Sequence, residues 1–317
     1  MPEGDFKLAP ARTSVVDEAL AGLTASRKSL PPKFFYDRTG CELFGAITGL
    51  PEYYPTRTER LILGGCMPEL AALTPQGAAL VEYGASDEGK AAILLDALDL
   101  AAYVPIDIAH EALEGLRRRM LRSHPGLPVH PLAADFTDDS CPFSLPRAVR
   151  GLPVLGFFPG STIGNFDPLA ARMLLASMRK TLGQGAALLI GVDLRKPEEI
   201  LVPAYDDAEG VTAAFNLNLL ARLNREADAD FDLGGFAHRA IWNGKESRIE
   251  MHLESLAEQT VHVAGVPVSF RQGETIHTEN SYKYTPQRFV SLAAEAGWHG
   301  ARMWTDPDRL FSVHLLR

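Results

Sequence analysis

The sequence predicts an α/β fold built on a mostly parallel sheet whose strands are joined by helices. Two observations predict it. Short apolar runs alternate with segments of helical spacing between residues 78 and 192, which is the order of parallel strands and crossover helices. A chain of 317 residues, 46% of them hydrophobic and 22% charged, is also long enough for one large domain and a smaller one.

The elements can be placed in order along the chain. Strands are expected at residues 78–83, 102–106, 128–132, 154–158, 186–192, 301–304 and 311–316. Helices are expected at residues 91–98, 111–122, 170–182 and 286–296. Gly297 closes the last helix, and TDPDR separates the last two strands, which therefore form a hairpin. A parallel sheet that ends in a hairpin preceded by a helix is the outline of a class I methyltransferase, with a Rossmann-like, mostly parallel seven-stranded sheet.

Two segments do not fit this outline. Residues 1–57 are rich in aromatic, proline and turn residues, and residues 196–283 interrupt the sheet between its fifth strand and its last helix. We expect these segments to meet and form a second, smaller α+β domain that binds the substrate. The expected domains are 58–195 with 284–317 for the cofactor, and 12–57 with 196–283 for the substrate.

The stretch AALVEYGASDEGK, residues 78–90, carries the strongest functional signal. An apolar run ends in an acid and Gly84, and a turn of small residues then opens a helix, an order that brings a nucleotide-like ligand against bare backbone. Asp107 follows 23 residues after Gly84, at the end of the next expected strand, where an acid suits two vicinal ribose hydroxyls. The simpler alternative is an ordinary strand, turn and helix with Ser86 as the helix cap.

The turn GASDEG also restricts the kind of ligand. It lacks the second glycine that lets a pyrophosphate approach the backbone, and Asp87 and Glu88 would repel one. The ligand should therefore carry a ribose and no diphosphate, which favours S-adenosylmethionine (SAM) over a nicotinamide dinucleotide. A nicotinamide-dependent oxidoreductase is the alternative from another class, and a SAM-binding sensor without catalysis is a third.

Composition excludes several partners. The net charge of −9, with LRRRMLR at residues 116–122 as the main basic run, argues against nucleic acid. No apolar segment approaches about 18 uninterrupted residues, and MPEGDFKLAP has no apolar signal core, so we expect a cytoplasmic protein without membrane contact. Cys41, Cys66 and Cys141 are odd in number and lack metal-ligand spacing, so neither a disulfide framework nor a metal site is expected.

Five motifs carry a resemblance to a known family. They are KFFYDRTGCELFGAITGLPEYYPTRTE (33–59), GSTIGNF (160–166), AYDDAEGVTAAFNLNLL (204–220), RIEMHL (248–253) and HTENSYKYT (277–285). In this order they are similar to the histidine-specific SAM-dependent methyltransferases, the L-histidine Nα-methyltransferases of ergothioneine biosynthesis. The resemblance extends from about residue 30 to the end of the chain.

The resemblance implies a set of cofactor-binding residues. Gly84 and Lys90 would hold the methionine part of SAM, Asp107 the ribose, and Asp135 with Phe136 the adenine. The turn itself departs from the family, which often has a second glycine where this chain has Ser86 or Asp87. Without the family, a solvated helix residue at Lys90 and a core aromatic at Phe136 would be the simpler interpretations.

The resemblance also implies an acceptor site. Glu279 and Ser281 alternate along an expected strand, so both can recognise one imidazole ring. Asn165 and Tyr205 would bind the substrate carboxylate, and Tyr36 would lie near the amine. Tyr53 would lie near the imidazole, and Met251 would form a wall of the ring pocket. Aromatic packing at Tyr36 and Tyr53 and a turn-forming role for Asn165 are the alternatives.

The expected reaction is transfer of methyl groups from SAM to the α-amine of L-histidine until the nitrogen is quaternary, with S-adenosyl-L-homocysteine as the product of each transfer. The Gly160 carbonyl or Tyr36 would orient the neutral amine, since such a transfer depends mainly on positioning. Asn165, which would hold the substrate carboxylate, is the third expected catalytic residue. Another amino acid, for example tryptophan, or another amine is the alternative acceptor. We expect L-histidine as the small-molecule partner and a monomeric protein.

Overall fold

The computed structural model describes residues 14–85, 89–137 and 143–317, and its contacts divide the chain into two units. Unit 1 contains the described residues up to Glu52, Val202–Trp242 and Glu250–Glu279. Unit 2 contains Tyr53–Leu201, Asn243–Ile249 and Asn280–Arg317. That one domain binds the cofactor and the other binds the substrate remains a prediction.

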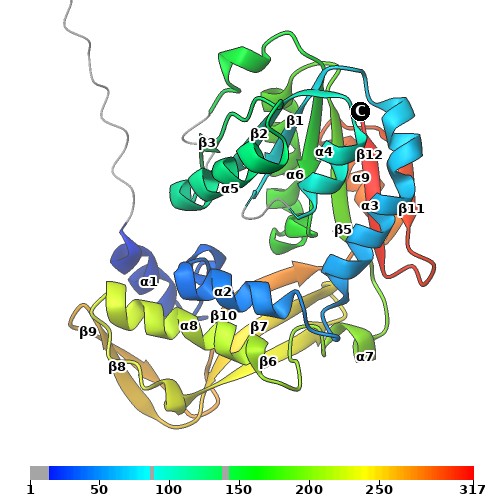
Figure 1. The fold of residues 1–317 in the computed structure, drawn as a ribbon. Helices are drawn as coiled ribbons and strands as arrows, with labels where there is room; N and C mark the ends of the chain where they lie inside the picture. Colours follow the sequence, from blue (N-terminus) through cyan, green and yellow to red (C-terminus); the bar gives the residue numbers. More distant parts are fainter. Residues whose placement is uncertain (1–13, 86–88, 138–142) are drawn as a thin grey trace, which may run out of the picture. The chain divides into compact units, whose positions relative to one another are not determined.

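Unit 2 is built on a seven-stranded sheet of order β11-β12-β5-β4-β1-β2-β3 (Figure 1). Strands β1, β2, β3, β4 and β5 pair in parallel, whereas β12 is antiparallel to both β5 and β11. This arrangement confirms the predicted mostly parallel sheet ending in a hairpin. The strands are β1 (Ala78–Tyr83), β2 (Leu100–Asp107), β3 (Leu132–Ala133), β4 (Val154–Phe158), β5 (Ala187–Asp193), β11 (Gly300–Thr305) and β12 (Phe311–Leu316).

Helices cover both faces of this sheet because each strand alternates its side chains between two apolar clusters. One cluster joins the sheet to α6 (Pro168–Leu182) and α9 (Pro286–Glu295). The other joins it to α3 (Tyr54–Leu73), α4 (Ala91–Ala97) and α5 (His110–Ser123) (Figure 1). Unit 2 also contains the short helices η2 (Arg147–Val149), η3 (Thr162–Asn165) and α7 (Glu198–Leu201).

The expected strand at residues 128–132 is shorter than predicted. The carbonyl of Pro128 and the amide of His130 bond the backbone of Tyr103 at 2.9 and 2.8 Å, so pairing with β2 does begin there. The next residue of β2 that faces this segment is Pro105, which has no amide hydrogen to donate to His130, and the ladder is interrupted there. Regular pairing resumes only over the two residues of β3.

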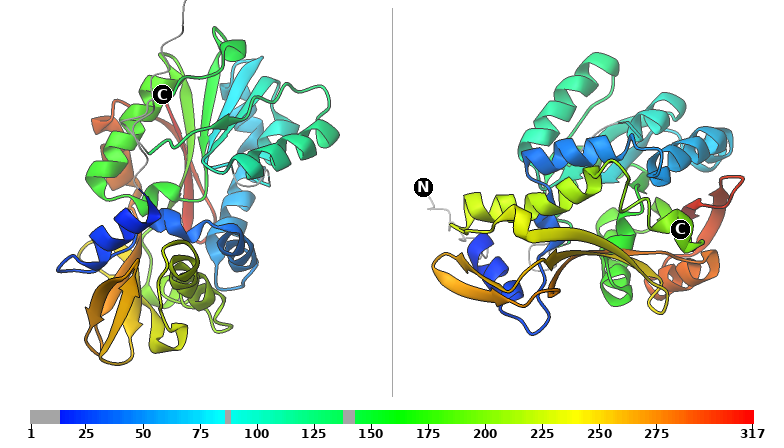
Figure 2. Two further views of the ribbon diagram at one scale, coloured as in Figure 1. Left: turned by 90° about the vertical axis from the view of Figure 1, so that its left-hand side faces the viewer. Right: turned by 90° about the horizontal axis from the view of Figure 1, so that it is seen from below.

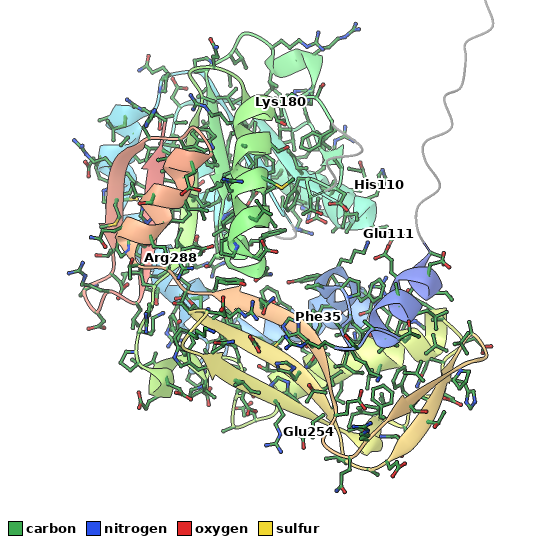
Figure 3. All side chains as sticks on the ribbon, turned by 180° about the vertical axis from the view of Figure 1, so that it is seen from behind. Phe35, His110, Glu111, Lys180, Glu254 and Arg288 are labelled. Atoms are coloured by element: carbon green, nitrogen blue, oxygen red, sulfur yellow. The ribbon has the colours of Figure 1, made fainter. Side chains whose placement is uncertain are left out.

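Apart from η4, described below, the helices among the described residues of unit 1 are α1 (Val15–Leu23), η1 (Pro32–Phe35), α2 (Arg38–Ile47) and α8 (Val211–Glu226). The first three pack against α8 (Figure 2). Phe35, labelled in Figure 3, stacks on Phe215 of α8 with ring centroids 4.4 Å apart.

The β-structure that begins in unit 1 comprises a hairpin and a three-stranded sheet. The hairpin pairs β8 (Gln259–Val263) with β9 (Val266–Phe270). The sheet has the order β10-β7-β6, formed by β6 (Phe236–Asn243), β7 (Arg248–Ser255) and β10 (Thr275–Tyr282), and η4 (Leu233–Gly235) precedes β6. The burial of β7 alternates along the strand, so one of its faces belongs to a core.

The buried ring of His314 makes the stability of the fold depend on pH. His314 lies in β12, is 1% exposed, and its Nε2 is 3.0 Å from the Ser312 hydroxyl. Burial lowers the pKa of His314 to about 4. An unfolded chain would titrate this ring near pH 6.5, so it binds more protons than the folded chain as the pH falls from about 6.5 to 4. The free energy of unfolding should fall by roughly 3 kcal/mol over that window.

Urea unfolding of the wild type and of His314→Gln at pH 7.5, 5.5 and 4.5 measures this contribution. The variant lacks the titrating ring, so its free energy of unfolding should depend less on pH by the same amount. Parallel pH profiles for the two proteins would contradict the assignment to His314.

Candidate active site

Gly84 shapes the turn at the carboxyl end of β1. Its φ is +76°, a conformation that favours glycine, and a Cβ built there would meet no described atom within 4 Å. The amides of Gly84 and Ala85 both donate to the carbonyl of Ile106, at 2.9 and 3.1 Å, which ties the turn to the end of β2. The backbone therefore presents bare surface at this edge of the sheet. The residues Ser86, Asp87 and Glu88, on which the argument against a diphosphate rests, lie outside the described part of the chain.

Asp107 ends β2, beside the Gly84 turn. One of its carboxylate oxygens accepts from the amide of Ala109 at 2.8 Å. Burial raises the pKa of Asp107 above its usual value, and the backbone amides of Ala109 and Ile108 only partly oppose this rise. Hydroxyl donors from a ligand would stabilise the charged form and lower the pKa again. This chemistry fits the two hydroxyls of a ribose.

Asp135 and Phe136 follow β3 at the same edge. Asp135 Oδ1 accepts from the amide and hydroxyl of Thr137 at 2.9 and 2.5 Å, which fixes the carboxylate. Phe136 contacts Tyr83 and Phe158 edge to face, with ring centroids 5.7 and 5.8 Å away. An apolar aromatic wall next to an oriented acceptor can bind a purine with an exocyclic amine.

Lys90 forms an ion pair that the sequence did not predict. Its Nζ lies 2.6 Å from Glu59 Oε2, and the Glu59 side chain is fully buried. Both oxygens of Glu59 also accept from the amide of Gly160, at 3.1 and 2.9 Å. A Cβ on Gly191 would lie 2.0 Å from Glu59 Oε1, so β5 leaves space for this carboxylate only because residue 191 is glycine. Lys90, whose side chain is 17% exposed, is therefore the cationic partner of a fully buried carboxylate, and its contact with the methionine part of SAM remains a prediction.

A second buried ionic cluster lies at the carboxyl end of β5. Asp193 accepts from Tyr54 at 2.9 and 2.8 Å, from Lys196 at 2.5 Å and from Lys283 at 2.6 Å. Burial alone would raise the pKa of Asp193, but the two ammonium groups hold it below its usual value. Burial lowers the pKa of Lys196 to about 8. Lys283 also donates to the Ser281 hydroxyl at 2.8 Å, so the cluster fixes this predicted substrate residue.

The GSTIGN turn after β4 carries Asn165 at the end of η3. Ser161 adopts a left-handed conformation with φ of 55°, and its carbonyl accepts from the amide of Gly164 at 2.8 Å. A Cβ on Gly164 would lie 2.8 Å from the carbonyl of Tyr282, so the turn packs closely against the end of β10. Asn165 and Ser281 are thus attached to neighbouring parts of unit 2.

In unit 1, Tyr36 extends from the segment between η1 and α2 and is 44% exposed. Its ring packs edge to face against Phe44 and Phe215, with centroids 6.1 and 6.3 Å away. The Asp37 carboxylate caps α2 by accepting from the amide of Gly40 at 2.7 Å. The backbone around Tyr36 is therefore fixed while much of the phenol ring remains at the surface of the unit.

The other predicted acceptor residues belong to different elements. Met251 is buried in β7, and its carbonyl accepts from the Thr278 hydroxyl at 3.0 Å. Glu279 shares β10 with Ser281, two residues apart, so both point to the same side of the strand. Tyr205 lies in the loop before α8, and Tyr53 directly precedes α3. Tyr36, Tyr205, Met251 and Glu279 belong to unit 1, whereas Tyr53, Asn165 and Ser281 belong to unit 2.

Sequence reasoning missed the buried polar residues that support these side chains. They are Glu59, Asp193, Lys196, Lys283 and, in unit 1, His238. The only signal was a charged or polar residue next to apolar or aromatic neighbours, as in YKYT around Lys283. Such a residue is often exposed, so this signal alone does not predict a buried partner.

Comparison with known families assigns the chain to the SAM-dependent methyltransferases. The model of the histidine-specific, SAM-dependent methyltransferases matches residues 15–317, and the chain belongs to this family. It is 44% identical to a histidine N-alpha-methyltransferase of Mycolicibacterium smegmatis, over 93% of this chain and 92% of the relative. Identity to the Mycobacterium tuberculosis protein of the same name is 41%, over 94% of this chain and 93% of that protein.

Solved structures support the fold independently. The mitomycin 7-O-methyltransferase MmcR matches with a TM-score of 0.50 at 12% identity, over 90% of this chain and 59% of that one. Within the described ranges, no helix is long and apolar enough to cross a membrane. The same residues contain no group of three or more His, Cys, Asp or Glu side chains that could hold a metal ion.

Two substitutions should separate the structural role of Lys90 from the cofactor role assigned to Asp107. Lys90→Met leaves the Glu59 carboxylate buried without its cation, so it should lower the free energy of unfolding of the SAM-free protein by about 3–5 kcal/mol. Asp107→Ala removes a partner of the ribose and should weaken SAM binding by about 2–3 kcal/mol. Asp107→Ala should lower the free energy of unfolding of the SAM-free protein by less than about 1 kcal/mol, because burial already disfavours the charged form of this carboxylate.

Calorimetric titration with SAM and urea unfolding of the SAM-free protein test both variants. Unchanged SAM affinity in a folded Asp107→Ala protein would argue against the placement of the ribose. An unchanged unfolding midpoint for Lys90→Met would show that the ion pair contributes little to the fold.

Proposed function

We propose that this enzyme methylates the α-amine of L-histidine three times, giving Nα,Nα,Nα-trimethylhistidine (hercynine), the first step of ergothioneine biosynthesis. The observation that carries the proposal is family membership over residues 15–317, together with an acid and a hydroxyl at alternate positions of β10. A cytoplasmic location and a monomeric state remain predictions from the sequence.

The sheet edge of unit 2 is proposed to bind SAM. Asp107 accepts from the ribose hydroxyls, and Asp135 and Phe136 bind the adenine. Gly84 provides backbone that a ligand can approach closely. Bound SAM supplies an electrophilic methyl group on a sulfonium, and the protein's contribution is to hold the acceptor amine in line with it.

The imidazole of the substrate is proposed to be recognised by Glu279 and Ser281, with Met251 and Tyr53 against the ring. A carboxylate accepts from one ring N–H, and the serine hydroxyl, which accepts from Lys283, can interact with the second ring nitrogen. A ring without such nitrogens would leave these groups unsatisfied, which is a strong basis for selectivity.

The α-amine and α-carboxylate require different partners. Asn165 and Tyr205 are proposed to donate hydrogen bonds to the carboxylate. Tyr36 and the carbonyl of Gly160 are proposed to orient the amine after it has lost its proton to solvent. A phenol ring also accommodates the growing cationic ammonium without a strong ion pair, which leaves space for further methyl groups.

Mass spectrometry after incubation with SAM and a mixture of the common amino acids tests the acceptor directly. Mass increases on histidine alone support the proposal. Methylation of tryptophan in preference to histidine would assign this chain to another acceptor within the same chemistry.

The number of transfers follows from the chemistry of nitrogen. A quaternary ammonium has no lone pair, so the reaction should stop after three methyl groups and consume three molecules of SAM for each histidine. Quantifying S-adenosyl-L-homocysteine and trimethylhistidine at excess SAM measures this ratio. Accumulation of monomethyl- or dimethylhistidine as the final product would refute it.

Substitution of Glu279 should change specificity more than it changes the fold. Glu279→Ala leaves a ring N–H without its acceptor, a loss that typically costs about 2–5 kcal/mol, or roughly thirtyfold or more in kcat/KM for histidine. Activity on tryptophan should fall less, or rise, because its ring cannot satisfy the carboxylate. The affinity for SAM should remain close to that of the wild type.

Glu254→Ala is the matched control. Glu254, labelled in Figure 3, lies on β7 and pairs with Arg239 at 2.7 Å, an ion pair that is partly exposed to solvent. Its removal should change kcat/KM for histidine less than about threefold, since exposed ion pairs contribute little. Equal losses for histidine and tryptophan in Glu279→Ala would indicate that Glu279 supports the fold and does not recognise the ring.

A further inference from the structure

The backbone of Tyr205 is bonded on both sides within unit 1. Its amide donates to the carbonyl of Val202 at 2.9 Å, and its carbonyl accepts from His238 Nε2 at 2.8 Å. Two residues later, the Asp207 carboxylate accepts from the amides of Val211 and Thr212, at 2.9 and 2.7 Å, at the start of α8. With both of its peptide groups bonded, the Tyr205 side chain leaves the loop in a defined direction.

The neighbours of His238 fix the protonation of its ring. A carbonyl oxygen can only accept, so Nε2 carries the proton that bonds Tyr205. The amide nitrogen of Asn216 lies 2.8 Å from Nδ1 and donates to it. Asn216 is fully buried in α8, and the same amide group also donates to the carbonyl of His252 at 3.0 Å, so two acceptors set its orientation. His238 is therefore a neutral ring of one tautomer that connects α8 to the Tyr205 loop.

We infer that His238 is a positioning residue: its Nε2–H bond to the Tyr205 carbonyl aims the Tyr205 side chain at the α-carboxylate of the acceptor amino acid. The inference rests on the proposed function, in which Tyr205 binds that carboxylate. His238 contacts the backbone of Tyr205 and is assigned no contact with the substrate. Its contribution should appear in the affinity for a carboxylate-bearing acceptor, with little change in SAM binding.

Two substitutions separate the two nitrogens of His238. In His238→Gln the side-chain amide nitrogen can occupy the place of Nε2 and keep the donor to Tyr205. In His238→Asn the side-chain oxygen can occupy the place of Nδ1 and keep the acceptor for Asn216, but the donor to Tyr205 is lost. The two variants have similar polarity, so a difference between them reports the bond to Tyr205.

The experiment measures the Kd of L-histidine and of histamine, which lacks the carboxylate, for enzyme loaded with S-adenosyl-L-homocysteine, together with kcat and the Kd of SAM. In His238→Asn the Kd of histidine should rise about tenfold, the effect of one lost hydrogen bond. The Kd of histamine should stay within about twofold of wild type, and kcat at saturating histidine within about threefold. His238→Gln should bind histidine within about threefold of wild type.

A Tyr205→Phe background makes the test independent of folding losses. There the carboxylate contact is already absent, so adding His238→Asn should have no further effect on the Kd of histidine. Equal weakening of histidine and histamine, or equal effects of the Asn and Gln variants, would overturn the inference and leave the proposed function standing. If His238→Asn does not fold, a Gln variant that binds histidine as weakly as Tyr205→Phe would overturn it. Failure of the wild-type enzyme to bind histidine would overturn the proposed function itself.

Discussion

The buried carboxylate of Glu59 is the constraint on which the cofactor edge of unit 2 depends. A charge without solvent must be fully paired, and here one ammonium from Lys90 and the amide of Gly160 supply the partners. These partners come from the start of α4 and the turn after β4, while Glu59 itself belongs to α3. None of these segments can move far without exposing an unpaired charge to an apolar interior. The edge that includes Gly84 is therefore organised by the protein alone, as a site that acts by positioning requires.

Asp193 serves the acceptor-binding elements of unit 2 in the same way. Its carboxylate binds Lys283, and Lys283 in turn binds the hydroxyl of Ser281. The same aspartate accepts from Tyr54, the neighbour of Tyr53, and its amide donates to Ser161 at the start of the turn that carries Asn165. The elements that carry three proposed substrate residues are thus all bonded to one buried residue, Asp193. In unit 1 a neutral histidine, His238, holds the backbone of Tyr205 in a comparable way.

The sequence predicted those parts of the fold that depend on local pattern. The apolar runs of β1, β4 and β12 match the structure to the residue, because buried strands between turn residues leave an unambiguous signal. The predicted length of β3 was wrong, because Pro105 of the neighbouring strand β2 lacks the amide hydrogen that continuous pairing would need. Helix α3 was not predicted; Gly64, Gly65 and Pro68 weaken its local helix propensity, and its packing against β12 stabilises it instead.

The ends of β1 and β2 could be assigned to one edge because parallel strands place their ends together. The sequence could not predict that Glu59 pairs with Lys90 or that Asp193 pairs with Lys283, because residues far apart in the chain come into contact only in the folded state.

Gly191 shows how strongly these buried charges restrict the surrounding sequence. Its φ is not positive, so the backbone conformation there would accept any residue, and what forbids a side chain is the Glu59 carboxylate 2.0 Å from the place of a Cβ, with the Phe311 ring 3.1 Å from it. Residues 59 and 191 can therefore be substituted only together. A side chain at 191 requires a shorter residue at 59, and a shorter residue at 59 withdraws the acceptor from Lys90 and Gly160. In a redesign or an evolutionary path, the three positions 59, 90 and 191, on three different elements, would have to change together, which is a reason for this corner of the sheet to change more slowly than the apolar core around it.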